Sequence, residues 1–415
     1  MSRHSHEIEV SSQLKHVRYE IRGTLARRAQ ELERQGYEVI PLNIGNPGLF
    51  GFRTPERLRL AMIENLPAAE PYSNQKGIFP AREAVVMQQQ ERGVDVSTEH
   101  VFIGNGVSEL IDLTLRGLLN PGDEVLIPSP DYPLWTAATF LNGGRPVPYA
   151  CPEADGFNPD VEQIEALITP RTRALVVINP NNPTGAVYSR ERLTALARLA
   201  ERHGLVLMCD EIYDQMVYDD AQFVPLATLC KDTLCATFSG LSKVYRACGY
   251  RVGWVSFSGT VDRSERYFAA LDLLAALRLC SNVPGQWAVQ TALGGYQSIQ
   301  KLCAPGGRLY QSRKAIIEGV AKSEFLTVVP PRGAMYAFIG VDKRKIRDFD
   351  DEEFAMELLE QQHVLIAPGS SFNTTYRDHF RITTLPEEGR LAEVFQRMEH
   401  VLGQIAERPP RLETA

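Results

Sequence analysis

The fold class is indicated by residues 174–210, ALVVINPNNPTGAVYSRERLTALARLAERHGLVLMCD. Ala174–Asn179 and Leu205–Asp210 are short apolar runs, the pattern of strands that are buried on both faces. Arg190–His203 lies between them and repeats its apolar residues at the spacing of an amphipathic helix. A strand, a helix and a second strand in this order predict a parallel sheet with helices packed on its faces.

The same alternation continues on both sides of this stretch. We expect a further helix at Glu109–Leu119 and further buried strands at Val101–Asn105, Glu124–Pro128, Leu234–Ser239 and Arg251–Phe257. The chain is therefore predicted to be an α/β protein with a mainly parallel sheet. In such sheets the ligand-binding loops gather at the carboxyl ends of the strands.

The pattern changes after about residue 300. Long helices are expected at Leu309–Ser323, Asp351–His363 and Glu388–Glu407, and short strands at Thr327–Val329, Met335–Phe338, Val364–Ala367 and His379–Thr383. We predict a large domain over residues 49–305 and a smaller α+β domain formed by residues 1–48 and 306–415. The basic stretch Arg3–Arg28 is interrupted by acidic residues and is interpreted as an amphipathic lead-in helix.

The composition argues against several classes of protein. The 415-residue chain has a net charge of −7 and a pI near 5.7, which argues against a nucleic-acid partner. No uncharged apolar run reaches the roughly 18 residues of a membrane span, and no apolar secretory segment begins the chain. Seven cysteines, an odd number without a C-x-x-C pair, favour the reducing cytoplasm. The scattered histidines indicate no metal site.

Two charged residues follow predicted strands at the expected ligand-binding edge. Lys243 ends the motif SGLSK, and a lysine desolvated at a buried strand end becomes a usable nucleophile for a carbonyl. The alternative is a solvent-exposed lysine. Asp210 ends an apolar strand and therefore needs a partner such as a protonated pyridine nitrogen. The alternatives for Asp210 are a helix N-cap and a structural ion pair.

Three loops lie next to the same predicted edge. Asn179–Gly185 (NPNNPTG) contains prolines that lack backbone donors, which leaves the asparagine amides available to a ligand; the alternative is a plain tight loop. Gly104–Ser108 (GNGVS) joins a strand to a helix start that favours an anion, although many such turns contain two glycines. In Asp131–Trp135 (DYPLW), Tyr132 is available to stack on a flat heterocycle or to pack in the core.

Taken together and in this order, these motifs resemble those of the class I/II aminotransferases of pyridoxal 5′-phosphate (PLP) fold type I. The similarity is greatest to bacterial glutamate–pyruvate (alanine) aminotransferases. It extends over nearly the whole chain and includes Leu42–Pro47 (LNIGNP), Phe102–Leu110 (FIGNGVSEL), Pro130–Ala137 (PDYPLWTA), Ile178–Ser189 (INPNNPTGAVYS), Arg278–Gln286 (RLCSNVPGQ), Thr291–Ile299 (TALGGYQSI) and His379–Ile382 (HFRI). The resemblance implies a seven-stranded type of mainly parallel sheet between helices, PLP as cofactor, and a homodimer with shared active sites.

The resemblance also implies roles for residues around the cofactor. Lys243 would bond covalently to the PLP aldehyde and move a proton during the reaction, and Asp210 would keep the pyridine nitrogen protonated. Tyr213 and Asn182 would hydrogen-bond the cofactor 3′-oxygen. The remaining implied contacts are Tyr132 on the ring, Gly106, Val107, Ser108, Ser242 and Arg251 at the phosphate, and Tyr72 reaching the phosphate of the partner subunit's site.

On the substrate side, the resemblance implies that Arg381 grips the α-carboxylate in bidentate fashion, beside the backbone of Gly45 and the amide of Asn182. Arg22 is a candidate for binding a distal carboxylate, or else a surface residue. Tyr19 is a candidate for limiting the size of the substrate side chain, or else a packing residue.

Two positions depart from the family pattern. Many relatives have a hydroxyl residue three positions before the lysine, where this chain has Gly240; Ser242 or Ser239 would then supply the missing phosphate contact. Arg246 stands where many relatives have a small residue, and is interpreted as a surface residue.

The activity implied is a ping-pong transfer of the amino group between L-alanine, or a similar small amino acid, and 2-oxoglutarate, which gives pyruvate and L-glutamate. One alternative is a transaminase with another preferred amino acid, and a second is a PLP-dependent lyase of the same fold. A third is a PLP-sensing regulator, which would need a DNA-binding segment that does not fit before residue 48.

Overall fold

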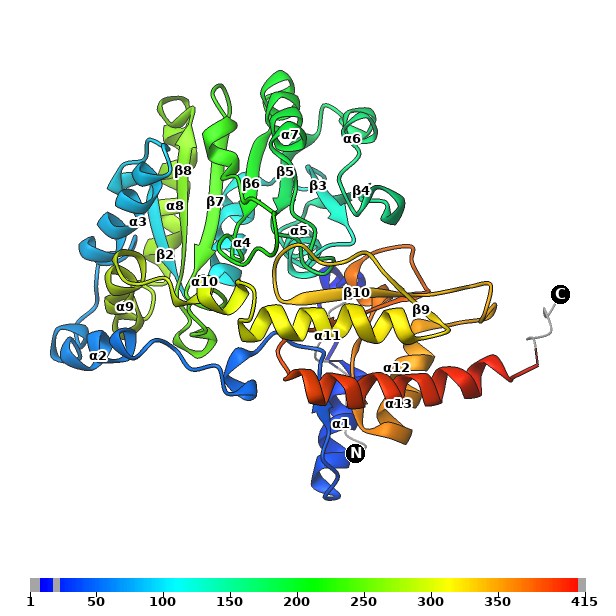
Figure 1. Ribbon diagram of the computed structural model, residues 1–415. Helices are drawn as coiled ribbons and strands as arrows, with labels where there is room; N and C mark the ends of the chain where they lie inside the picture. The colour runs from blue at the N-terminus through cyan, green and yellow to red at the C-terminus, as the bar shows by residue number, and fades with distance from the viewer. Residues whose placement is uncertain (1–7, 18–22, 410–415) are drawn as a thin grey trace, which may run out of the picture.

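The computed structural model describes residues 8–17 and 23–409, and its centre is a seven-stranded sheet (Figure 1). The strand order is β2-β8-β7-β6-β5-β3-β4. The strands from β7 to β4 are parallel to their neighbours, whereas β8 is antiparallel to both β2 and β7. The strands are β2 (Val101–Gly104), β3 (Glu124–Ser129), β4 (Arg145–Ala150), β5 (Thr172–Ile178), β6 (Val206–Asp210), β7 (Leu234–Gly240) and β8 (Gly253–Gly259). The predicted mainly parallel α/β sheet is confirmed.

Both faces of this sheet are buried under helices. In β5, Leu175 and Val177 join one apolar cluster, whereas Ala174 and Val176 join another on the opposite face. This explains why the strands appear in the sequence as continuous apolar runs. The helices around the sheet are α2 (Glu56–Glu64), α3 (Phe79–Glu91), α4 (Val107–Leu118), α5 (Leu134–Leu141), α6 (Val161–Leu167), α7 (Arg190–His203), α8 (Glu265–Leu277), α9 (Val283–Gly294) and α10 (Ser298–Cys303).

A second layer of structure is formed by both ends of the chain. A third apolar cluster combines residues between 25 and 42 with residues between 316 and 402. Its helices are α1 (Thr24–Arg34), α11 (Arg308–Lys322), α12 (Asp351–Gln362) and α13 (Glu388–Ala406), and α11 and α13 lie side by side in Figure 1. Its strands are β1 (Ile40–Pro41), β9 (Leu326–Val328), β10 (Tyr336–Val341), β11 (Val364–Leu365), β12 (Ala367–Pro368) and β13 (His379–Thr383). The division at residues 48/49 and 305/306 stays a prediction.

Several predicted elements differ from the observed ones. Strand β4 is not among the predicted strands. Its Pro146 and Pro148 are tolerated because β4 is an edge strand of the sheet. The predicted strand Val364–Ala367 is two strands, since β11 pairs with β1 and β12 pairs with β13. Strand β8 begins two residues later than predicted because Arg251 has a left-handed backbone, with φ of 52°.

The single lead-in helix expected over Arg3–Arg28 is also wrong for the described residues. A short 3-10 helix covers Ser12–His16 and ends at Val17, which is extended. The helix α1 begins only at Thr24, and residues 1–7 and 18–22 lie outside the described part of the chain. The 3-10 helix packs against α5, which starts within the Asp131–Trp135 motif, at Leu134.

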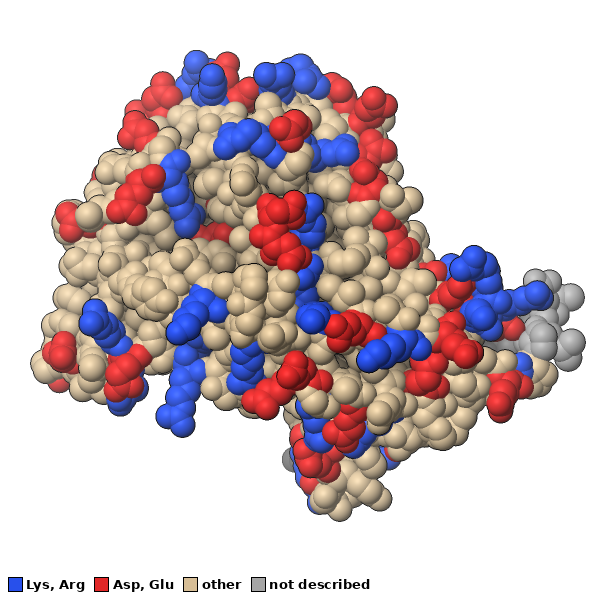
Figure 2. Space-filling model, viewed as in Figure 1, with Lys and Arg blue, Asp and Glu red and all other residues tan. Residues whose placement is uncertain are grey.

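The surface carries charges of both signs. Figure 2 shows acidic and basic side chains interspersed on the face viewed, without a continuous basic area. Within residues 8–17 and 23–409, no helix is both long enough and apolar enough to cross a membrane. The same residues contain no group of three histidine, cysteine or acidic side chains arranged to hold a metal ion.

Candidate active site

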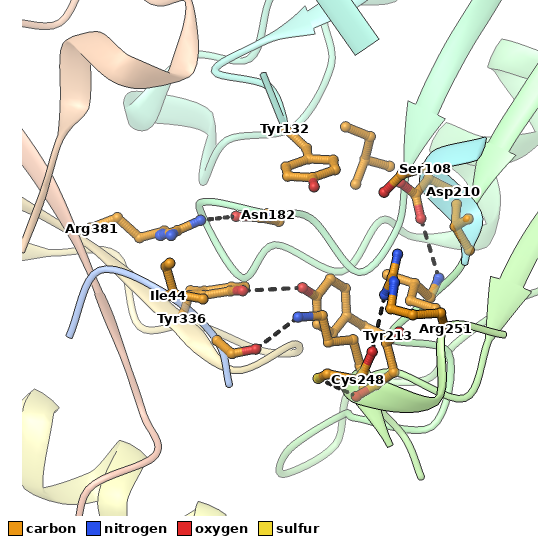
Figure 3. Close-up of a pocket in the computed structure, with 16 residues that line it drawn as sticks. Ile44, Ser108, Tyr132, Asn182, Asp210, Tyr213, Cys248, Arg251, Tyr336 and Arg381 are labelled. Carbon is orange, nitrogen blue, oxygen red and sulfur yellow. Dashed lines mark hydrogen bonds between the residues drawn. The ribbon is translucent and has the colours of Figure 1, made fainter. Parts of the chain in front are cut away.

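A cavity lies where β5, β6 and β7 end and meet the second layer. It combines most of the predicted site residues, and Figure 3 shows their side chains around it. The predicted residues that line the cavity are Gly45, Val107, Ser108, Tyr132, Asn182, Asp210, Tyr213, Ser242, Lys243, Arg251 and Arg381. The residues that follow parallel strands therefore meet at one edge of the sheet, as expected.

Lys243 follows β7 in a tight turn, in which the backbone N–H of Arg246 donates to the Lys243 carbonyl at 3.0 Å. The Lys243 Nζ points into the cavity and donates a hydrogen bond to the carbonyl of Gly45 at 2.7 Å. This contact joins the end of the large sheet to the segment that follows β1. The amine is thus held at the cavity wall rather than exposed on the surface.

Asp210 is the last residue of β6 and is only 3% exposed. Its carboxylate accepts a hydrogen bond from Trp135 Nε1 at 3.2 Å. Burial raises the pKa of Asp210 to about 6, although the Trp135 hydrogen bond and the charge of Lys243 act in the opposite direction. A buried acid that ionises with difficulty is best matched by a cationic partner, as a protonated pyridine nitrogen would be.

Arg381, on β13, is held rigidly at the other end of the cavity. Its Nη1 donates to Asn182 Oδ1 at 2.7 Å and its Nη2 donates to the carbonyl of Asn43. The guanidinium lies 4.1 Å from the ring centre of Tyr336 and 4.6 Å from that of Phe372. A planar cation with fixed orientation suits a carboxylate ligand.

The opposite end of the cavity has the features of an anion site. Helix α4 begins at Val107, so the N–H groups of its first turn are directed at the cavity together with Ser108. Gly106 has φ of 83°, and a Cβ at this position would overlap the guanidinium of Arg251. The absence of a side chain at Gly106 therefore lets Arg251 approach the helix start.

The departure at Gly240 has a steric reason. A Cβ at this position would lie 2.7 Å from the carbonyl oxygen of Val252, so no hydroxyl side chain fits between the two strands. Ser242 lines the cavity, whereas Ser239 is not among its lining residues. Of the two serines considered for the missing contact, Ser242 has the suitable position.

The asparagine loop is partly structural. Asn179 Oδ1 accepts the backbone N–H of Tyr188 at 3.0 Å, and Asn181 Oδ1 accepts the hydroxyl of Thr184 at 2.7 Å. These two side chains hold the loop in shape, and Asn182 alone of the three lines the cavity. Of the three asparagines, only Asn182 is therefore placed to face a ligand, and its role as a ligand contact stays a prediction.

Among the predicted residues that the structure describes, Tyr72 and Gly106 do not line the cavity, and one assignment is wrong. Tyr72 is 78% exposed, away from the cavity, while Tyr19 and Arg22 lie outside the described residues. Arg246 is buried, not a surface residue. Its guanidinium donates to the carbonyls of Arg53 and Val244 and to Ser298 Oγ, because the turn after Lys243 directs it inward.

Ile44, Ile178, Ile212, Cys248 and Tyr336 line the cavity and were not predicted, nor was Trp135 beside Asp210. Trp135 is part of the motif DYPLW, and its contact with Asp210 depends on packing between α5 and β6. Tyr336 starts β10, in a predicted strand without any motif, and lines the cavity. The aromatic residue within DYPLW was a usable signal for Trp135; nothing local indicated Tyr336.

PLP presents an aldehyde, a pyridine nitrogen and a phosphate, and the cavity offers each of them a suitable group: an amine, a buried acid and a helix start with an arginine. Together with the seven-stranded mainly parallel sheet, this chemistry defines a PLP-dependent enzyme of fold type I.

The chain belongs to the class I and II aminotransferases, whose family model matches residues 37–397. It is 48% identical to the glutamate-pyruvate aminotransferase AlaA of Escherichia coli over 380 residues, covering 91% of this chain and 94% of the relative. It is 47% identical to an alanine aminotransferase of Mycobacterium bovis, covering 94% of this chain and 92% of the relative.

Solved structures agree with this assignment. The structure is similar to that of an aminotransferase from Escherichia coli with a TM-score of 0.95 and 46% identity, covering 97% of this chain and 100% of the other. An alanine aminotransferase from Pyrococcus furiosus has a TM-score of 0.90 and 34% identity, covering 95% of this chain and 100% of the other. The protein is thus a PLP-dependent aminotransferase that acts on amino acids and 2-oxo acids.

Proposed function

We propose that the protein transfers the amino group between L-alanine and 2-oxoglutarate, giving pyruvate and L-glutamate in a ping-pong reaction. The main supporting observation is that the cavity contains a rigid carboxylate-binding cation, Arg381, together with the amine of Lys243. The names of the relatives support alanine and glutamate as the amino acids.

When bound, PLP supplies an aldehyde that takes up amino groups and a ring that accepts electrons from the breaking bond. Arg381 binds the substrate α-carboxylate and so orients the α-carbon. Lys243 Nζ takes the proton from the substrate α-carbon in one half-reaction. In the other half-reaction it gives a proton back to the α-carbon of the product. Asp210 holds a proton on the ring nitrogen, and Tyr213 with Asn182 donates to the 3′-oxygen.

The other proposed roles concern binding. Tyr132 stacks on the ring, while the backbone of Gly106 and Val107 and the side chains of Ser108, Ser242 and Arg251 hold the phosphate. Ile44 and Tyr336 also line the cavity, and the Tyr336 ring lies against Arg381 at 4.1 Å. Tyr19 and Arg22 stay candidates for limiting side-chain size and for binding the distal carboxylate of glutamate.

The test is a single half-reaction of the PLP-loaded enzyme with alanine alone. We expect one pyruvate per site and then no further turnover, because the amino group stays on the cofactor until a 2-oxo acid arrives. Adding 2-oxoglutarate should restore pyruvate formation and yield glutamate, and Lys243→Ala should do neither. Continuous release of ammonia without a 2-oxo acid would indicate a lyase. A faster half-reaction with another amino acid would mean that this amino acid, and not alanine, is the preferred substrate.

We also propose that two copies form a homodimer in which Tyr72 reaches the phosphate site of the partner. Tyr72 lies on an exposed loop beside α8. Gln75 in the same loop donates a hydrogen bond from its Nε2 to Asp272 Oδ1 on α8 at 3.0 Å. Leu273 and Leu277 on α8 and Leu279 just after it are also exposed, and apolar side chains gathered in this way favour an interface.

None of the seven cysteines is in a disulfide, which supports a cytoplasmic location.

A further inference from the structure

The cavity contains a second buried phenol, Tyr336, directly opposite the proposed cofactor contact Tyr213. Tyr336 is 3% exposed, and its hydroxyl lies 3.3 Å from the hydroxyl of Tyr213, within hydrogen-bond distance. The two rings meet edge to face with 6.0 Å between their centres. In Figure 3 this pair lies between Arg381 on one side and Ser108 with Arg251 on the other.

The position of the Tyr336 hydroxyl is fixed by its surroundings. The guanidinium of Arg381 lies over the Tyr336 ring at 4.1 Å. A Cβ at position 45 would overlap the Tyr336 hydroxyl, so Gly45 leaves the space that this hydroxyl occupies. The carbonyl of the same glycine accepts the hydrogen bond from Lys243 Nζ. Tyr336 thus contacts Arg381, which forms the carboxylate site, and Gly45, which accepts the hydrogen bond from Lys243.

The charges around the pair make the two phenols unequal. The titratable or charged groups that face Tyr336 are Tyr213, Lys243, Arg381 and Cys248. Burial opposes ionisation of Tyr336, but the positive charges of Lys243 and Arg381, together with the hydrogen bond to Tyr213, lower the pKa of this phenol. Burial raises the pKa of Tyr213. The more acidic phenol is the stronger hydrogen-bond donor, and a hydroxyl hydrogen rotates freely to suit its partners.

We propose that Tyr336 is a positioning residue that acts through Tyr213. In this structure the Tyr213 hydroxyl donates to the Tyr336 oxygen. Rotation of both hydroxyl hydrogens reverses this bond when Tyr213 donates to the cofactor 3′-oxygen, so that Tyr336 donates to Tyr213 and strengthens it as a donor. The inference rests on the proposed role of Tyr213. A hydrogen bond to an anionic oxygen favours its deprotonated form, so Tyr336 lowers the pH at which the nitrogen joining Lys243 to PLP loses its proton.

The test is a pH titration of the visible absorbance of the bound cofactor. In Tyr336→Phe the midpoint should rise by about half a pH unit, within the range expected for one hydrogen bond. Because phenylalanine keeps the ring under Arg381, the alanine concentration for half-maximal rate of the half-reaction should stay close to that of the wild type. A merely structural role would change alanine binding and leave the midpoint in place.

A double-variant comparison shows whether the effect passes through Tyr213. The midpoint of Tyr213→Phe should lie above that of the wild type, and the Tyr213→Phe/Tyr336→Phe double variant should equal Tyr213→Phe. Tyr218→Phe is the matched control, because this equally buried phenol donates to the Ala334 carbonyl at 2.9 Å and does not line the cavity. It should leave the midpoint unchanged.

An unchanged midpoint in Tyr336→Phe, or shifts that add fully in the double variant, would overturn the inference. Failure of PLP to bind at Lys243 looks different. In that case the wild type itself would show no visible absorbance change with pH, and borohydride would trap no cofactor on Lys243. A lyase or another preferred amino acid would be recognised from the half-reaction with alanine.

Discussion

Asp210 shows how a single residue links the cost of burial to cofactor binding. It is the charged last residue of the otherwise apolar strand β6, and Trp135 and the backbone of Ile212 are its hydrogen-bond donors. The rise of its pKa from 3.8 to about 6 corresponds to about 3 kcal/mol that the folded protein without cofactor must offset when the acid ionises. A cationic ring nitrogen would remove this penalty.

Asp210→Asn should therefore separate stability from function. The pKa of Asp210 is raised in the folded state, so its destabilising effect is absent below pH 4 and grows as the pH rises through about 6. Above that pH we expect the cofactor-free variant to be more stable than cofactor-free wild type by about 1–3 kcal/mol, because asparagine can still accept from Trp135. Its affinity for PLP should fall sharply, since it cannot balance the ring charge.

Denaturant unfolding of the cofactor-free proteins between pH 4 and 8, with parallel PLP titrations, measures both effects. A variant that is less stable than wild type throughout this range would show that Asp210 contributes to the fold and not only to the site.

At the residue scale, the sequence predicts that a residue belongs to the site when the strand that it ends or follows determines its position. Asp210 ends an apolar strand and Lys243 follows one, so their place at the sheet edge follows from local pattern. Tyr336 has no such signal, because its partners Gly45 and Tyr213 come from distant parts of the chain. Arg246 was misjudged for the same reason: its acceptors are Arg53, Val244 and Ser298, and two of these lie far away in sequence.

At the scale of elements, the turn after β3 is joined to the 3-10 helix Gly369–Phe372 of the second layer. The Asp131 carboxylate accepts from Asn373 Nδ2 at 2.9 Å and from Thr136 Oγ1 at 2.6 Å. The backbone N–H of Asp131 donates to the carbonyl of Phe372 at 2.9 Å. Because Tyr132 follows Asp131 and the ring of Phe372 lies under Arg381, this contact connects the stacking tyrosine to the carboxylate site.

Asn373→Gly should weaken this connection without straining the backbone, because Asn373 has φ of 50° and glycine adopts this conformation readily. We expect the alanine concentration for half-maximal rate to rise about threefold to tenfold, as for the loss of one hydrogen bond. Kinetics of the half-reaction measure this value. His363→Gly is the matched control, since it also has a positive φ, of 53°, but lies at the end of α12 outside the cavity. Equal effects in both variants would argue against the connection.

The elements themselves were predicted where one periodicity lasts long enough. Helix α7 has the predicted bounds, because fourteen residues repeat one amphipathic pattern between Ser189, its N-cap, and Gly204. The split between β11 and β12 was not predictable from residues 364–368, because it depends on which partner strand each half meets. The edge strand β4 was not predicted for a similar reason: its place in the sheet, not its composition, makes it a strand.

For the whole molecule, the position of Tyr72 leads to a prediction about two subunits. Tyr72 is 78% exposed and does not line the cavity of its own chain. If it completes the partner's phosphate site, a defect at Tyr72 and a defect at Lys243 fall in different active sites of a mixed dimer. Tyr72→Ala and Lys243→Ala subunits, each poorly active alone, should therefore restore activity when they are co-expressed.

The size of this recovery follows from the symmetry of a dimer. With random pairing, half of the dimers are mixed, and each has one intact site, so the mixture should reach about a quarter of wild-type activity. The matched control is a mixture of Arg381→Ala and Lys243→Ala subunits. Both residues line the same cavity of one chain, so every site in that mixture keeps at least one defect and no recovery is expected. Recovery in the control, or none in the Tyr72 mixture, would mean that Tyr72 does not act across the interface.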